Sequence, residues 1–246
     1  FDNGTTLGFD FEHEMANGLT GFARLEEDGF DMVDGGATTN FTDEAYFGVR
    51  GDFGSVQFGR NDSVYDDNIS DNFDYQEVFA PTAYGPTRER ALQFNSADLN
   101  GLTFALEAGF QGDADESNSE ADSVSLAGAI SYDFGMFSLT GAYDQRGNDV
   151  NTDTGATNSA SDDTKVAVDN PVVGVVASFD LGSVAVDLGY QTWEEDDATT
   201  NVDTVEYDLV SVGGRYNYGP GDIYGVFQQL DVKETGSASD LTNEDY

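Results

Sequence analysis

The chain contains no cysteine, one histidine and nine basic residues among 246. Without cysteine it can form neither a disulfide framework nor a thiolate metal site. The single histidine, His13, lies in no recognisable Ser-His-Asp context, and no glycine-rich phosphate loop is present. So few basic residues also leave no positively charged footprint for nucleic acid. These absences argue against an enzyme and against a nucleic-acid-binding protein.

Long apolar stretches are missing too. The longest, residues 172–179, is far shorter than the roughly 20 residues of a membrane-spanning helix. No signal peptide is visible. Proline is scarce at 4 residues, whereas glycine reaches 29 and aromatic residues 13%, which favours strands and tight turns. A membrane β-barrel remains compatible with this composition, because each strand needs only about 10 alternating residues.

Acidic residues are in large excess, with 48 Asp and Glu giving a formal net charge of −39. Such a chain repels itself strongly at low ionic strength. We therefore infer a salty medium, since the Debye length falls from about 8 Å at 0.15 M to about 3 Å at 1 M salt. Disorder is disfavoured, because 38% of the residues are hydrophobic and they alternate regularly with polar ones.

Residues 44–60, EAYFGVRGDFGSVQFGR, show the repeating unit of the chain. Apolar Ala45, Phe47 and Val49 alternate with their neighbours, as in a strand with two different faces. Residues 52–55 supply a glycine-containing turn, and residues 56–60 return the chain. An acidic segment without sustained periodicity, residues 61–87, follows. The unit is a hairpin followed by a long loop.

The same unit recurs along the chain and predicts twelve strands in six hairpins, with short turns alternating with long polar loops. The predicted strands are residues 5–12, 19–26, 44–50, 56–60, 91–97, 102–111, 124–133, 137–144, 171–180, 183–193, 204–218 and 222–233. Within 204–218 the alternation changes phase near Leu209 and Val210. We expect there either a β-bulge or a strand end with a different exposure.

One face of nearly every predicted strand is apolar and the other is polar, which a soluble β-sandwich and a membrane barrel share. Large aromatic residues near strand ends favour the barrel, because they are typical of the girdles at the membrane interfaces. The residues expected to face outward in these girdles are Tyr46, Tyr132, Phe137, Phe179, Tyr190, Tyr207 and Tyr216.

Residues 44–60 resemble the fourth and fifth strands of the general porins of Gram-negative bacteria. Residues 5–26, TTLGFDFEHEMANGLTGFARLE, resemble the preceding strand pair, and residues 90–110, RALQFNSADLNGLTFALEAGF with its leading arginine, resemble the sixth and seventh strands. The resemblance implies an all-β, antiparallel transmembrane β-barrel of sixteen strands in the full protein, about twelve of them in this chain. It also implies a homotrimer in which the third external loop, here residues 61–87, folds inward as a constriction loop.

Counted against that family, residues 1–246 form a single β-barrel domain lacking one N-terminal strand and about three C-terminal strands. The end, ASDLTNEDY, lacks the alternating final strand with a terminal aromatic residue. We therefore expect a fragment of a longer protein. A closed twelve-stranded barrel is the alternative, and its first and last strands would have to pair in lipid.

The resemblance also implies a cluster of wall arginines facing acidic residues of the third loop. Arg60 matches one wall position, although Gly59 must break the strand alternation if Arg60 is to face the pore; otherwise Arg60 anchors the base of the loop. Two further wall positions fall at Thr6 and Gln93, which are not basic. Arg88 and Arg90, at the junction of loop and strand, partly compensate. Further candidates for the lumen are Arg24, Arg50, Gln93, Arg146 and Arg215.

Six loop acids are candidates for the opposite side of the constriction: Asp62, Asp66, Asp67, Asp71, Asp74 and Glu77. An acidic aperture opposite a thinned arginine wall predicts cation preference. Only charges at the narrowest point should count in brine, because one unit charge at 10 Å contributes about 0.4 kcal/mol even in unscreened water.

No cofactor is expected. Residues 149–153, DVNTD, begin like a calcium loop, but the glycine and glutamate expected later in such a loop are missing. Loose binding of calcium or other cations by the acidic loops is the favoured interpretation.

The sequence thus predicts a porin in the outer membrane of a salt-adapted Gram-negative bacterium. It would span lipid and pass small hydrophilic solutes by diffusion. The alternatives are a secreted or surface-bound acidic β-protein that binds calcium or glycans, and a barrel specific for a sugar or for phosphate. An acidic pore disfavours phosphate, and Trp193 alone provides no aromatic track for sugars.

Overall fold

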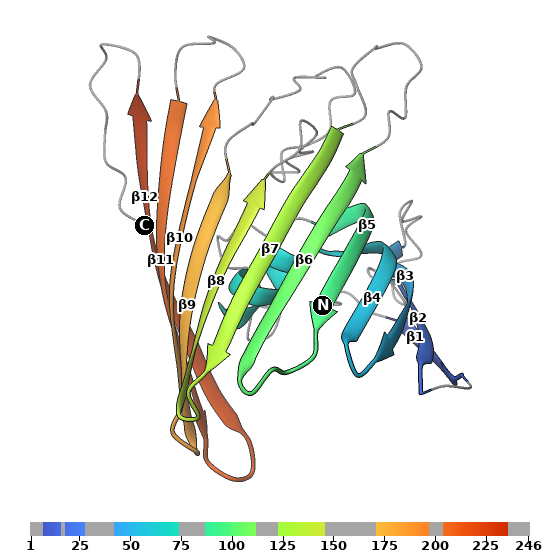
Figure 1. Ribbon diagram of the computed structural model, residues 1–246. Coiled ribbons are helices and arrows are strands. Elements are labelled where there is room, and N and C mark those ends of the chain that lie inside the picture. The colour runs from blue at the N-terminus through green and yellow to red at the C-terminus, as the bar shows by residue number, and fades with distance from the viewer. Residues whose placement is uncertain are drawn as a thin grey trace, which may run out of the picture.

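The computed structural model describes residues 7–15, 18–27, 42–73, 87–111, 123–145, 171–196 and 204–235. They form twelve antiparallel strands and one short helical segment (Figure 1). The strands are β1 (Leu7–Glu14), β2 (Thr20–Glu27), β3 (Thr42–Gly51), β4 (Gly54–Asp62), β5 (Thr87–Ser96), β6 (Leu102–Gln111), β7 (Ser123–Asp133), β8 (Phe137–Gln145), β9 (Val172–Asp180), β10 (Val184–Asp196), β11 (Thr204–Asn217) and β12 (Asp222–Thr235).

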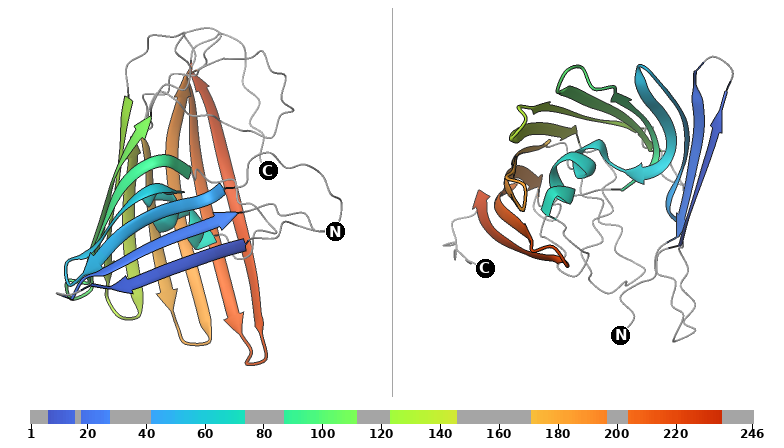
Figure 2. Two further views of the ribbon diagram at one scale, coloured as in Figure 1. Left: turned by 90° about the vertical axis from the view of Figure 1, so that its right-hand side faces the viewer. Right: turned by 90° about the horizontal axis from the view of Figure 1, so that it is seen from below.

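All twelve strands lie in one sheet, in the order of the sequence and without a crossover. Each strand is therefore hydrogen-bonded to its neighbours in the chain, which is the up-and-down topology of a barrel wall. The twelve predicted strands are confirmed, and their bounds differ from the observed ones by a few residues. The sheet curves strongly, and its concave side encloses the helical segment (Figure 2).

Short turns join the strands at one end of the sheet, whereas of the connections at the other end only residues 63–73, after β4, and residue 171, before β9, are described (Figure 1). The turn between β5 and β6 shows the chemistry. Asn100 and Gly101 both have positive φ angles, 61° and 92°. A tight two-residue hairpin turn requires this conformation, and asparagine and glycine are the residues that adopt it most easily.

The convex face of the sheet is apolar and open to its surroundings. Phe9 and Phe11 of β1 are 50% and 60% exposed, and Leu106 and Ile130 are 54% and 57% exposed. The residues between them point to the concave face, where Glu107, Gln93 and Ser125 are buried. An apolar outer face that covers strand after strand fits lipid and is far larger than the patches of soluble monomers. Within the described residues, no helix is long and apolar enough to cross a membrane.

The change of phase in β11 comes from exposure, and the predicted bulge is wrong. β11 pairs with β10 and β12 in unbroken register from Thr204 to Asn217. Leu209 is fully buried on the concave face, and Val210 is 46% exposed on the convex face. This end of β11 carries apolar residues inward because the helical segment packs there.

Two of the expected outward aromatics also face inward. Tyr207 stacks on Trp193 with ring centroids 5.1 Å apart, and it packs against the buried cluster on the concave face. Tyr46 pairs with Gly59 and lines a pocket together with Arg24 and Gln57. Their position near strand ends was therefore not sufficient to assign them to the lipid face.

Candidate pore constriction

The chain leaves β4 and turns into the concave side of the sheet as a short helical segment, η1 (Asp66–Ser70) and η2 (Asp71–Phe73) (Figure 2). Ser63 starts it, because its hydroxyl accepts a hydrogen bond from the Asp66 N–H at 3.1 Å, as an N-cap does. Tyr65, Ile69 and Phe73 follow at intervals of four residues, which places them on one face of a helix. We call residues 63–73 the loop helix.

The apolar face of the loop helix is buried against strands β9, β10 and β11, which we call the far wall. Tyr65, Ile69 and Phe73 are at most 1% exposed and belong to a cluster with residues of β9, β10 and β11. Two wall glycines make room for them: a Cβ at Gly174 would lie 2.4 Å from the Tyr65 hydroxyl, and one at Gly189 would lie 2.5 Å from the Phe73 ring. Burial of each such side chain contributes about 1.5–3 kcal/mol.

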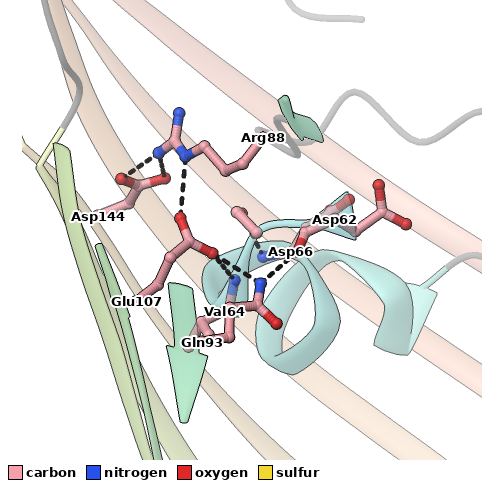
Figure 3. A network of polar contacts seen from close by, with 8 residues as sticks. Asp62, Val64, Asp66, Arg88, Gln93, Glu107 and Asp144 are labelled. Atoms are coloured by element: carbon pink, nitrogen blue, oxygen red, sulfur yellow. Dashed lines mark hydrogen bonds and ion pairs between the residues drawn. The ribbon is translucent and has the colours of Figure 1, made fainter. Parts of the chain in front are cut away.

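Polar contacts fix the start of the loop helix to the near wall (Figure 3). Glu107 of β6 accepts the Val64 N–H at 2.9 Å and the Gln93 side-chain amide at 2.8 Å through one carboxylate oxygen. The same Gln93 nitrogen donates to the Asp62 carbonyl at 2.7 Å. Two wall strands therefore hold the point where the chain leaves β4.

Arg88 joins this network and is 6% exposed. Its Nε donates to the other oxygen of Glu107 at 3.0 Å, and one Nη reaches both oxygens of Asp144 of β8 at 2.5 Å (Figure 3). Both carboxylates are fully buried. A guanidinium between two carboxylates limits the cost of burying all three charges. The positive charge of Arg88 is consequently compensated by Glu107 and Asp144 of the wall strands.

A β-bulge turns Arg88 inward. In the pairing of β4 with β5, Gly59 lies opposite Ala91, but Asn61 lies opposite Arg88, so β5 has one extra residue. The extra residue reverses the alternation of β5. Without it, Arg88 would lie in the row of Leu92, which is 43% exposed on the convex face.

Arg60 shows no such shift on the side of β3. It pairs with Ala45, in the same row as Phe47 and Phe58. Its Nε donates to the main-chain carbonyl of Asp43 at 3.0 Å. Gly59 does adopt a φ of 149°, but the register with β3 continues through it. This contact ties the end of β4 to the beginning of β3 at the base of the loop.

The other arginines of the described wall differ in their surroundings. Arg24 pairs with Asp10 at 3.6 Å and also contacts Glu26 and Glu44. Arg50 donates to Glu12 at 2.6 Å. Arg90 and Arg215 are exposed.

The loop acids gather near the beginning of the loop helix. Asp62 and Asp66 are half-buried, whereas Asp67 and Asp71 are exposed. Partial burial, followed by the charges of Asp71 and Asp62, raises the pKa of Asp66 to about 8. Although part of Asp67 reaches solvent, the surrounding protein removes much of the water around its carboxyl, and this loss, followed by the charges of Asp62 and Asp71, raises the pKa of Asp67 to about 7. The acids are therefore close enough to disfavour one another's ionisation.

Several predicted residues lie outside the described part of the chain, namely Asp74, Glu77, Arg146 and the calcium-like segment 149–153. Within the described residues, no group of three or more His, Asp or Glu residues could hold a metal ion.

Sequence reasoning missed two features of this site. Glu107 and Asp144 are not among the residues predicted for the constriction, although each is the one charged residue of its strand. The loop helix was missed as well. Its spacing, Tyr65–Ile69–Phe73 after the cap residue Ser63, is the pattern that would have predicted it.

Comparison with known proteins identifies the family of the chain. The family model described as Gram-negative porin matches residues 1–245. A protein named "Monosaccharide porin" from Halomonas sp. is 33% identical over 247 residues, and so is the "Major outer membrane protein" of Halomonas elongata. Each alignment covers 94% of this chain and 64% of the relative, so the chain spans about two thirds of their length.

Solved porin structures share the fold. The OmpF porin of Salmonella typhi superposes with a TM-score of 0.70 at 19% identity, covering 98% of this chain and 76% of OmpF. An anion-selective porin from Comamonas acidovorans gives a TM-score of 0.67 at 18% identity, covering 93% and 69%. With an apolar convex face, a polar concave face and the family match over the whole length, the chain belongs to the Gram-negative porins, a family of non-enzymatic channels of the bacterial outer membrane.

Proposed function

We propose that the complete protein forms a water-filled channel through which small hydrophilic solutes diffuse passively, and that residues 61–87 form its constriction loop. The observation that carries the proposal is the loop helix, seated on the concave face of a porin wall through Tyr65, Ile69 and Phe73. A helix fixed inside a barrel narrows the passage that solutes must use. A secreted acidic β-protein would have no use for the exposed apolar convex face.

The channel prefers cations in this proposal. Asp62, Asp66, Asp67 and Asp71 lie on or beside the loop helix, while the charges of Arg24, Arg50 and Arg88 are compensated by neighbouring carboxylates. An aperture in which acidic side chains outnumber basic ones lowers the energy of a passing cation and raises that of an anion. At a distance of 4 Å the effect is about 1 kcal/mol in water, and salt weakens it.

The test is the reversal potential of the full-length protein in a planar bilayer with a tenfold salt gradient. A reversal potential with the sign expected for a cation-selective channel supports the proposal, and the cation preference should become smaller as the total salt concentration rises. Anion preference would contradict it. A protein that stays folded and soluble without detergent would contradict the channel itself.

A second candidate function is passage of sugars. The relative named "Monosaccharide porin" is 33% identical over nearly the whole chain, which favours a monosaccharide among the solutes. Trp193 does not supply an aromatic track for it, because this ring is 8% exposed and stacked on Tyr207.

The partners we propose are outer-membrane lipid, small hydrophilic solutes and two further copies in a homotrimer, with loose cation binding by the acidic loops.

A further inference from the structure

The concave face of β1–β4 holds a pocket of about 410 Å³. This volume falls within the range of roughly 300–1,000 Å³ that small-molecule sites occupy. Its lining comes from all four strands and includes Asp10, Glu12, Phe22, Arg24, Arg50 and Gln57. Except for parts of Phe11 and Ala23, whose side chains belong to the opposite row, the lining residues stand in register on one face of the sheet.

An aromatic ring forms part of the pocket wall. Phe22 is opposite Gly48, where a Cβ would lie 2.5 Å from the ring, so the glycine lets the ring lie close to the sheet. Tyr46 packs edge-on against Phe22, with the two ring centroids 6.3 Å apart. The Arg50 guanidinium lies over the Phe22 ring, 5.7 Å from the centroid of that ring. These neighbours fix the orientation of a ring that remains only half-buried.

The charges that line the pocket balance one another, in a chain with a formal charge of −39. Two acidic and two basic side chains contribute to the lining, and they are paired: Arg24 with Asp10 at 3.6 Å and Arg50 with Glu12 at 2.6 Å. Arg24 also contacts Glu26 and Glu44 beyond the lining. Paired groups attract a free ion weakly, but their remaining donor and acceptor positions can still bind hydroxyl groups.

We propose that this pocket is a binding subsite for a neutral polyhydroxylated solute of monosaccharide size. Vicinal hydroxyls would bind the fixed arginine and carboxylate groups together with Gln57, and the apolar C–H face of the sugar ring would contact Phe22. The inference rests on the proposed channel function and its second candidate, passage of sugars, and adds to them the site and the residues that bind the solute.

The pocket lies close to the candidate constriction. Gln57 lines the pocket and donates to Gln93 at 3.0 Å, and Gln93 donates to the Asp62 carbonyl where the loop leaves β4. A solute held in the pocket would therefore lie next to the base of the loop helix, on the wall that faces it.

The experiment measures ion current through the full-length protein in a planar bilayer while glucose is added. A bound sugar obstructs the current, so the wild type should show a saturable decrease. Phe22→Leu should raise the half-saturating glucose concentration by about tenfold, because an aromatic contact is lost. Arg50→Gln should raise it as well, and it removes an exposed ion pair of a kind that contributes little to stability. Phe47→Leu is the matched control, since it makes the same change on the convex face of β3, and it should behave as wild type.

Each other outcome counts against one of the two ideas. A conducting channel without saturable block by glucose, or with equal block in wild type, Phe22→Leu and Arg50→Gln, overturns the subsite and leaves the channel intact. Stronger block by gluconate, which has similar size and a negative charge, overturns its preference for a neutral solute. A full-length protein that does not conduct overturns the proposed function itself.

Discussion

The hydroxyl of Tyr65 occupies the space that a side chain at Gly174 would need: a Cβ there would lie 2.4 Å away from it. The same hydroxyl donates to Gln191 Oε1 on the neighbouring strand at 3.2 Å. The position of the loop helix is thus determined by the far wall, both by the missing side chain at Gly174 and by the side chains, such as Gln191, that contact Tyr65.

Gly174→Ala should loosen the loop helix. The added methyl group displaces Tyr65, and overpacking of this kind costs about 1–3 kcal/mol of stability. We expect a lower melting temperature in detergent, followed by circular dichroism, and a noisier open-channel current. Gly225→Ala is the control, because a Cβ at this position meets nothing within 4 Å. Equal melting temperatures of the two variants would contradict the tight contact at Gly174.

Arg88→Ala should destabilise the protein strongly. It leaves Glu107 and Asp144 buried without their cation, and breaking a buried ion pair from one side costs about 3–5 kcal/mol. The expected readouts are a lower urea midpoint in detergent and faster proteolytic cleavage of residues 61–87. Arg90→Ala removes the same charge from an exposed position two residues along the strand and should change little.

Cation preference should rise with pH between about pH 6 and pH 9, one unit on either side of the two raised pKa values of Asp67 and Asp66. Both carboxyls become charged over this interval. The reversal potential in a salt gradient, measured at several pH values, checks it. The double variant Asp66→Asn with Asp67→Asn should be flat over the same interval. An unchanged pH profile in this variant would assign the titration to other groups.

The same two carboxyls set a direction for stability. Their pKa values lie above the ordinary 3.8, so between about pH 4 and pH 8 the folded protein binds more protons than the unfolded chain. Their contribution to stability is complete at low pH and is lost as the pH rises through 7 and 8. The change in the free energy of unfolding from pH 5 to pH 9 should therefore be less favourable for the wild type than for the double asparagine variant.

Neighbouring residues of β8 test the two faces of the wall. Leu139→Arg places a charge on the convex face, where Leu139 is 46% exposed, and should cost roughly 2 kcal/mol on folding into lipid vesicles. Thr140→Arg places it one residue along, on the concave face beside Ser131, to which the Thr140 hydroxyl donates. This second variant should fold nearly as well as wild type. Equal losses would contradict the assignment of the faces.

The wall could be predicted from the sequence because each strand repeats one local rule, with apolar and polar residues alternating and glycine or asparagine at the turns. The site could not be predicted so well, because it depends on departures from that rule. Arg88 faces inward owing to one extra residue in β5, and no local pattern around it distinguishes this bulge from regular alternation. Leu209 and Tyr207 are apolar on the inner face because of Phe73, which lies more than a hundred residues earlier in the chain.

The strictly sequential order of the strands has a consequence for assembly. Every strand finds its main-chain partners next to it in the chain, so the wall can grow hairpin by hairpin from residues close in sequence. The loop helix cannot follow this order, since it leaves β4 but packs on β8, β9 and β11. It reaches its resting place only after the chain has extended the wall by seven further strands, so the wall must stand before the aperture is set.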